Sequence, residues 1–157
     1  MTTIAFIGLG IMGSPMSVHL ARAGYDVVGY NLTPDRTGPL EAAGGRAAGS
    51  VAEAVAEADV VAVMVPDSPD VQAVLTGEDG VFDTAKPGTL VIDFSSIRPD
   101  VTAQLDREAT ERGLRLVEVP IAWYYHASSR VDPLRDTIRM IRDILRVRLN
   151  DWRGRYA

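Results

Sequence analysis

The sequence predicts a doubly wound α/β domain with a mostly parallel sheet, followed by an added C-terminal amphipathic helix. Short β-rich runs alternate with helical patterns over the first 120 residues, as expected when helices connect parallel strands. The strand candidates are continuous apolar runs, which suits strands buried on both faces of a sheet. Glycines stand just past several helix ends, where a left-handed residue stops a helix.

The predicted strands are short runs of apolar residues, several of them β-branched, separated by turns and helical patterns. They cover residues 3–7, 26–30, 59–65, 89–94 and 114–119. The run 59–65 is the most apolar of them. Doubly wound sheets bind their ligands at the carboxyl ends of the strands. The functional residues are therefore expected directly after strands.

The predicted helices have recognisable first and last residues, and they cover residues 11–23, 34–43, 50–58, 68–75 and 99–112. The first ends before Gly24, and the second has a proline in its first turn. The third opens with a capping box, in which Ser50 accepts a backbone hydrogen bond and Glu53 reaches back. The fourth opens at the serine–proline pair 68–69, and the fifth is closed by Gly113.

The composition narrows the class of protein. Apolar residues make up 46% and charged residues 24% of the chain, which is an ordinary globular balance. The formal net charge of -5 does not indicate nucleic acid or an anionic membrane as a partner. The absence of cysteine excludes disulfides and thiolate zinc sites and favours the cytoplasm. The longest apolar run, residues 60–66, is too short to span a bilayer.

The first strand runs directly into a glycine-rich turn, Gly8-Leu9-Gly10-Ile11-Met12-Gly13. Gly8 permits a tight turn, Gly10 allows a pyrophosphate to approach the backbone, and Gly13 lets the next helix pack closely. The start of that helix offers free N–H groups and the positive end of a dipole to phosphates. Because the motif follows a buried strand and opens a helix, it predicts a Rossmann-type dinucleotide site.

The end of the second strand bears on the choice of cofactor. NAD-binding domains usually have Asp or Glu there to hold the ribose hydroxyls, whereas this strand ends in Tyr30-Asn31. Asn31 can hydrogen-bond a ribose without repelling a 2′-phosphate, and Thr33, Arg36 and helix N–H groups can bind that phosphate. NADP(H) is therefore the expected cofactor and NAD(H) the less favoured one. An exposed helix residue without a ligand is the alternative interpretation of Arg36.

Two later segments also lie just after strands. Met64, Val65 and Pro66 are expected beside the ribose of the cofactor, and Ser96 is expected at its nicotinamide end. Ser96 can donate a hydrogen bond to a substrate carboxylate or to the nicotinamide ribose, but a helix-capping role is equally open. The sequence offers no metal site and no residue that can be named as catalytic.

The segment 6–20, Phe-Ile-Gly-Leu-Gly-Ile-Met-Gly-Ser-Pro-Met-Ser-Val-His-Leu, closely resembles the N-terminal signature of the β-hydroxyacid dehydrogenases. These include 3-hydroxyisobutyrate dehydrogenase and tartronate semialdehyde reductase, and the NADP-binding domain of 6-phosphogluconate dehydrogenase is similar. The resemblance continues through residues 63–67, 77–82 and 91–97 and covers roughly residues 3–120. Imine reductases resemble the same region and are the nearest competing identification.

The resemblance implies reversible hydride transfer between a nicotinamide cofactor and a small β-hydroxyacid or its semialdehyde. It also implies that residues 8–13, Asn31, Met64, Val65 and Ser96 contact the cofactor, with Ser96 near the substrate. Many NADP-preferring members carry an arginine directly after the asparagine, where this chain has Leu32.

The resemblance ends at Pro120. The family continues with Asp-Ala-Pro-Val-Ser-Gly-Gly, whereas this chain reads Glu-Val-Pro-Ile-Ala-Trp over 118–123. The catalytic lysine and the helical C-terminal domain of the family have no counterpart, because Lys86 lies in a turn before a strand. We therefore expect a truncated oxidoreductase domain that is not active alone. A non-enzymatic NADP(H)-binding sensor or regulator and a gene fragment are the alternatives.

The charge of the chain changes sign near the same point. Residues 1–120 contain 8 basic and 17 acidic residues, whereas residues 121–157 contain 8 arginines and 4 aspartates. Residues 1–120 are therefore expected to form the dinucleotide-binding domain, and residues 121–157 an arginine-rich tail. Apolar residues recur at helical spacing over 134–149 and predict an amphipathic helix. This helix can pack on the sheet, bind a helical partner or second copy, or lie on a membrane surface.

Overall fold

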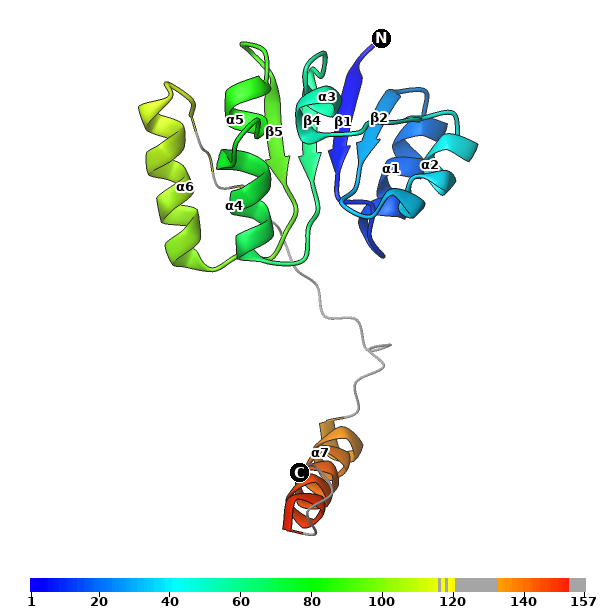
Figure 1. Ribbon diagram of the computed structural model, residues 1–157, viewed down its shortest axis with the longest axis vertical. Helices are drawn as coiled ribbons and strands as arrows, with labels where there is room; N and C mark the ends of the chain where they lie inside the picture. Colours follow the sequence, from blue (N-terminus) through cyan, green and yellow to red (C-terminus); the bar gives the residue numbers. More distant parts are fainter. Residues whose placement is uncertain (116, 118, 121–132, 153–157) are drawn as a thin grey trace. The chain divides into compact units, whose positions relative to one another are not determined.

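The structure is a computed structural model, and it describes all residues except 116, 118, 121–132 and 153–157. The chain divides into two compact units, Met1–Val117 and Glu118–Ala157. The first unit is an α/β layer structure in which the labelled strands all point the same way (Figure 1). No described helix is long and apolar enough to cross a membrane.

The first unit is built on a five-stranded sheet with the order β3-β2-β1-β4-β5. Its strands are β1 (Thr3–Ile7), β2 (Asp26–Tyr30), β3 (Arg46–Ala47), β4 (Val60–Val63) and β5 (Leu90–Asp93). All neighbouring pairs are parallel. The doubly wound parallel sheet predicted from the sequence is therefore confirmed. The two-residue strand β3 was not predicted, because it is too short to show a pattern.

The strand predicted at 114–119 is wrong for the described residues of that segment, which are 114, 115, 117 and 119. Leu114, Val117 and Val119 are 43%, 59% and 73% exposed. A β-rich run becomes a strand only where a neighbouring strand and a buried face stabilise it. The described residues here have neither.

The helices of the first unit pack on both faces of the sheet. They are α1 (Gly13–Arg22), α2 (Gly38–Ala42), α3 (Val51–Val55), α4 (Ser68–Thr76), α5 (Val81–Thr84) and α6 (Pro99–Glu111). The single helix predicted over 34–43 is divided into the 3₁₀ turn η1 (Pro34–Arg36) and α2. The short α5 was not predicted. The capping box is confirmed, since Ser50 accepts from the N–H of Glu53 and the Glu53 carboxylate accepts from the N–H of Gly49.

Both faces of the central strands are buried, which explains their continuous apolar sequences. Ala5, Ile7 and Val28 pack in a core with residues of α3, α4, α5 and α6. Ile4, Phe6 and Val27 point the other way and pack in a second core with residues of α1 and α2. Alternate residues of one strand thus enter different cores.

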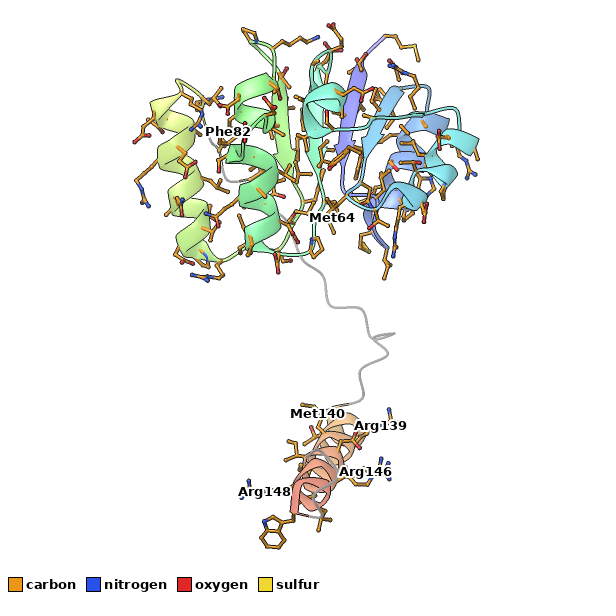
Figure 2. All side chains as sticks on the ribbon, in the orientation of Figure 1. Met64, Phe82, Arg139, Met140, Arg146 and Arg148 are labelled. Atoms are coloured by element: carbon orange, nitrogen blue, oxygen red, sulfur yellow. The ribbon has the colours of Figure 1, made fainter. Side chains whose placement is uncertain are left out.

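Strand β5 differs from the central strands because it pairs with β4 and with no other described strand. Leu90, the first residue of β5, and Phe94, the residue directly after it, are 57% and 47% exposed. In α5, the ring centroid of Phe82 (Figure 2) lies 6.0 Å from the guanidinium carbon of Arg112. Among the described strands, β5 is therefore an apolar strand at one edge of the sheet.

The second unit contains the helix α7 (Pro133–Trp152). It confirms the helix predicted over 134–149 and extends it at both ends. Figure 2 shows Arg139 and Arg146 on one side of α7 and Met140 and Arg148 on the other. Its large apolar side chains are mostly solvent-exposed: Ile138, Met140, Ile141, Ile144, Leu145, Leu149 and Trp152 are each at least 48% exposed.

Candidate cofactor-binding site

The turn between β1 and α1 requires glycine at its first position. Gly8 has a φ of +97°, and a Cβ on it would lie 2.2 Å from the carbonyl oxygen of Met64. The N–H of Gly8 donates to the carbonyl of Tyr30 at 2.9 Å. Gly8 therefore holds the turn tightly between β2 and the residue that follows β4.

The other two glycines of the motif differ from each other. A Cβ on Gly13 would lie 1.8 Å from the carbonyl oxygen of Gly8, so α1 packs directly against the turn. A Cβ on Gly10 would meet nothing within 4 Å. This open space above the backbone of Gly10 is where a pyrophosphate is expected.

The start of α1 is suited to an anion. Its N-cap residue, Met12, makes no side-chain capping hydrogen bond, and Ile11 and Met12 are 87% and 57% exposed. No side chain caps this end of the helix, but the N–H of Ser14 donates to the carbonyl of Gly10 at 3.0 Å and Pro15 has no N–H, so the free groups are those of Gly13 and of the turn before it. Together with the helix dipole they favour a phosphate group at this end. The open backbone at Gly10 and the uncapped helix fit a dinucleotide pyrophosphate.

Asn31 joins this turn to the loop that follows β2. Its side-chain Oδ1 accepts from the N–H of Leu9 at 2.8 Å, and its Nδ2 donates to the carbonyl of Thr33 at 2.9 Å. The side chain of Leu9 is buried in the core, at 1% exposure. Leu9, which was predicted to contact the cofactor, thus already has its N–H bonded to Asn31.

The residues predicted to bind a 2′-phosphate lie in the loop after Asn31. Leu32, Thr33 and Arg36 are all exposed, and Leu32 is 86% exposed. The helix N–H groups expected there are not present as a helix terminus, since η1 is a single turn of three residues. The N–H of Arg36 instead donates to the carbonyl of Thr33 at 3.3 Å. The exposed side chains of Thr33 and Arg36 remain as candidate phosphate ligands.

A cavity of about 180 Å³ lies beside this loop. It is lined by Tyr30, Asn31, Leu32, Thr37, Ala47, Ala48 and Gly49. Carboxylates accept from two of its donors: Glu41 from the Thr37 hydroxyl at 3.1 Å, and Glu53 from the Gly49 N–H at 2.7 Å. The cavity is on the β2 side of the glycine turn, where the adenosine half of a dinucleotide is expected.

The other half of the site is formed after β4 and β5. Met64 lies at the carboxyl end of β4 (Figure 2) and its N–H donates to the carbonyl of Ile7 at 2.8 Å. The N–H of Val65 donates to Ser95 Oγ at 3.0 Å. Val65 is partly buried, whereas Pro66 is exposed.

The two serines after β5 have different surroundings. Ser95 is partly buried and bonded to Val65, while Ser96 is exposed and its hydroxyl makes no hydrogen bond within the described part of the chain. The capping alternative for Ser96 is wrong, since α6 begins after Arg98. Ser95 was missed from the sequence, although its position directly after a strand could have indicated it.

The chain's only lysine lies away from this site. Lys86 Nζ is 2.9 Å from Asp59 Oδ1 and 3.1 Å from the carbonyl of Glu57. Hydrogen bonds from the N–H of Thr3 and from Lys86 hold the pKa of the Asp59 carboxyl below its ordinary value. Asp59 precedes β4, so this pair is at the amino ends of the strands. Among the described residues, no group of three or more side chains is arranged to hold a metal ion.

The glycine turn, Asn31 and the residues after β4 are therefore joined by direct contacts at the carboxyl ends of the strands. The residues after β5 join them through Ser95. The side chains of Thr33 and Arg36 make no such contact with these residues. The carbonyl of Thr33 does, because it accepts from Asn31 Nδ2. The arrangement can hold a dinucleotide across the end of β1, with Ser96 free to meet the group at its far end.

Comparisons with known proteins agree with this geometry. Residues 3–122 match the family model described as the NAD binding domain of 6-phosphogluconate dehydrogenase. The chain is 41% identical over 122 residues to an NAD-dependent L-serine dehydrogenase of Pseudomonas aeruginosa, covering 78% of this chain and 41% of that protein.

The first unit is also similar to solved structures of dehydrogenases and reductases. A 3-hydroxyisobutyrate dehydrogenase of Mycobacterium tuberculosis with L-serine is 41% identical, with a TM-score of 0.67, over 73% of this chain and 38% of that one. An imine reductase from Myxococcus stipitatus in complex with NADP⁺ is 26% identical, with a TM-score of 0.65, over 72% of this chain and 38% of that one. The chain spans about two fifths of the length of these relatives. It belongs to the family of the NAD-binding domain of 6-phosphogluconate dehydrogenase.

Proposed function

We propose that the chain is the NADP(H)-binding part of a β-hydroxyacid dehydrogenase-like oxidoreductase. The open backbone at Gly10 beside the uncapped start of α1 is the observation that carries this proposal. The similarity to an L-serine dehydrogenase and a 3-hydroxyisobutyrate dehydrogenase supports a small β-hydroxyacid, or its semialdehyde, as substrate. The non-enzymatic sensor is not favoured, because these relatives are dehydrogenases.

The residues of the site have separate roles in this proposal. Gly10 and the first turn of α1 bind the pyrophosphate, and Asn31 lies beside the adenosine ribose. Met64 and Val65 support the second ribose, and the free hydroxyl of Ser96 donates to the substrate carboxylate or to that ribose. The bound nicotinamide supplies or accepts the hydride.

This chain by itself is not expected to turn over substrate. Reduction of an aldehyde requires a proton donor beside the forming alkoxide, and the family resemblance assigns this role to a lysine. The only lysine of this chain is paired with Asp59 at the amino ends of the strands, away from the cofactor site. The lysine of the family therefore has no counterpart among the residues of this sequence.

Support for NADP(H) rather than NAD(H) comes from the loop after β2. An amide at Asn31 does not repel a 2′-phosphate, and the exposed side chains of Thr33 and Arg36 follow within five residues. A guanidinium–phosphate contact is among the stronger charged hydrogen bonds.

The absence of cysteine from the sequence agrees with the reducing cytoplasm as the compartment.

The test is a titration of the full chain with NADPH and with NADH, followed by nucleotide fluorescence. We expect saturable binding of both and a lower Kd for NADPH. Gly10→Val should abolish binding of both nucleotides without unfolding the protein, because its side chain enters open space. Arg36→Gln should weaken NADPH by about tenfold and leave NADH unchanged. Absence of binding by the folded wild-type chain would contradict the proposal.

We further infer that α7 pairs with α7 of a second copy of the chain. An isolated helix of about this length is marginal in water unless its apolar face is covered, and seven large apolar side chains of α7 are exposed. Light scattering after gel filtration should show a dimer that Leu145→Glu dissociates. Arg139→Gln, on another side of the helix (Figure 2), should leave the dimer intact. A monomeric wild-type chain would contradict this inference.

A further inference from the structure

The amide of Asn31 connects two separate loops of the cofactor site. Its Oδ1 accepts from the N–H of Leu9, 22 residues earlier in the chain, at 2.8 Å. Its Nδ2 donates to the carbonyl of Thr33, two residues later, at 2.9 Å. Leu9 belongs to the glycine turn, and Thr33 belongs to the loop after β2. One side chain therefore bonds to the parts of the site expected at the pyrophosphate and at the adenosine.

We propose that Asn31 is a positioning residue, which fixes the glycine turn and the loop after β2 relative to each other before the cofactor binds. This proposal rests on the proposed dinucleotide site. The sequence assigned Asn31 only a direct contact with the ribose. The structure gives it two protein partners, and a site whose loops are already ordered loses less entropy on binding.

The chemistry of the amide explains why asparagine suits this position. A side-chain amide offers an acceptor and a donor, whereas a carboxylate is only an acceptor at neutral pH. Aspartate could keep the bond from Leu9, but it would place a negative oxygen against the Thr33 carbonyl. After its two internal bonds, Asn31 retains one N–H and part of the capacity of its oxygen for a ligand.

The neighbours of Leu9 make its bond to Asn31 important. The Leu9 side chain is buried at 1% exposure, and the N–H of Gly8 is already bonded to the carbonyl of Tyr30. A Cβ on Gly29, the residue before Tyr30, would lie 3.0 Å from the Leu9 side chain. The turn is thus anchored to β2 by two consecutive N–H groups, and only the second depends on a side chain.

The first experiment needs no ligand. Amide hydrogen exchange of the full chain is measured by NMR for wild type, Asn31→Asp, Asn31→Ala and the control Leu32→Ala, whose side chain is 86% exposed. Asn31→Ala should speed exchange at the Leu9 amide by about tenfold or more, because its acceptor is lost. Asn31→Asp should retain protection at Leu9, and the control should match wild type. Unchanged exchange at Leu9 in Asn31→Ala would overturn the proposal.

The second experiment compares the two cofactors. Loss of positioning should weaken NADPH and NADH by the same factor, about tenfold, in Asn31→Ala. A residue that acted only by direct contact near the 2′-position would change the ratio of the two Kd values instead, which would overturn the proposal. Asn31→Asp should weaken NADPH more than NADH, since its charge repels the 2′-phosphate. If the wild-type chain bound neither nucleotide, the proposed function would fail, while the exchange result would still test the two internal bonds.

Discussion

The hydroxyl oxygen of Ser95 accepts a hydrogen bond from the backbone N–H of Val65 at 3.0 Å, and this bond joins the loops that follow β4 and β5. Ser95 is also held by its own backbone, since its N–H donates to Asp93 Oδ1 at 2.9 Å. The next residue, Ser96, is exposed. Two adjacent serines thus divide their roles, the first bonded to protein and the second open to a ligand.

The two serines should respond differently to replacement by alanine. Ser95→Ala leaves the partly buried N–H of Val65 without its acceptor and should cost about 1–2 kcal/mol of unfolding free energy. Ser96→Ala should leave stability unchanged within about 0.5 kcal/mol. Urea denaturation of both variants measures this. Equal destabilisation by the two changes would contradict the division of roles.

The three glycines of the turn should separate stability from binding. Gly8→Ala forces a side chain onto a φ of +97° and against the Met64 carbonyl, and Gly13→Ala places a Cβ against the Gly8 carbonyl. Each should lower the unfolding free energy by at least about 2 kcal/mol. Gly10→Ala should unfold like wild type and bind NADPH more weakly. Thermal unfolding paired with nucleotide titration checks this, and a strongly destabilised Gly10→Ala would contradict the open space seen there.

Asp59 should contribute stability that depends on pH. Its folded pKa lies below the ordinary value of 3.8 because Thr3 and Lys86 stabilise the carboxylate. The unfolded chain therefore binds a proton more readily, and the contribution is complete at neutral pH. It is lost as the pH falls below 3.8 and through the lower pKa of the folded protein.

Asp59→Asn should consequently lower the Tm at pH 7, and the difference from wild type should narrow as the pH falls below 3.8. Asp106→Asn, at an exposed position of α6, is the matched control and should show no such trend. A Tm difference for Asp59→Asn that is constant between pH 7 and pH 3 would mean that the charge of Asp59 is not its source.

Leu32 offers a test of how the loop after β2 selects its cofactor. Its side chain is 86% exposed, so Leu32→Arg is not expected to change stability. The new guanidinium should lower the Kd for NADPH by about tenfold and change that for NADH little. The control Leu32→Gln adds length and polarity without charge and should change neither. The ratio of the two Kd values from fluorescence titrations decides the outcome.

The sequence predicts the central layers of the fold better than its edges. β1, β2 and β4 follow from apolar runs, because buried central strands carry that pattern on every residue, and most helices follow from their caps and glycine stops, although α5 does not. The 114–119 run has the same composition but no strand in its described residues. Composition reports that a segment can be a strand, whereas pairing decides whether it is one.

For the cofactor site, the sequence likewise identifies some residues but not the hydrogen bonds that pair them. The glycine turn and Asn31 could be identified because their spacing follows from the geometry of a strand, a turn and a helix. The bonds from Leu9 to Asn31 and from Val65 to Ser95 connect residues 22 and 30 positions apart. Neither pairing has a local pattern, so both require the sheet order to be known.

Among the described strands, β5 lies at an edge of the sheet, and this position has a consequence for the behaviour of the first unit in solution. An exposed strand edge presents unpaired N–H and C=O groups in register and can template the addition of another extended chain. Leu90 and Phe94 add apolar surface at the same strand. We expect any association of the folded first unit through this edge to need no prior unfolding and to accelerate with concentration. A charged residue in place of Leu90 would slow such assembly without touching the cofactor site at the opposite end of the strand.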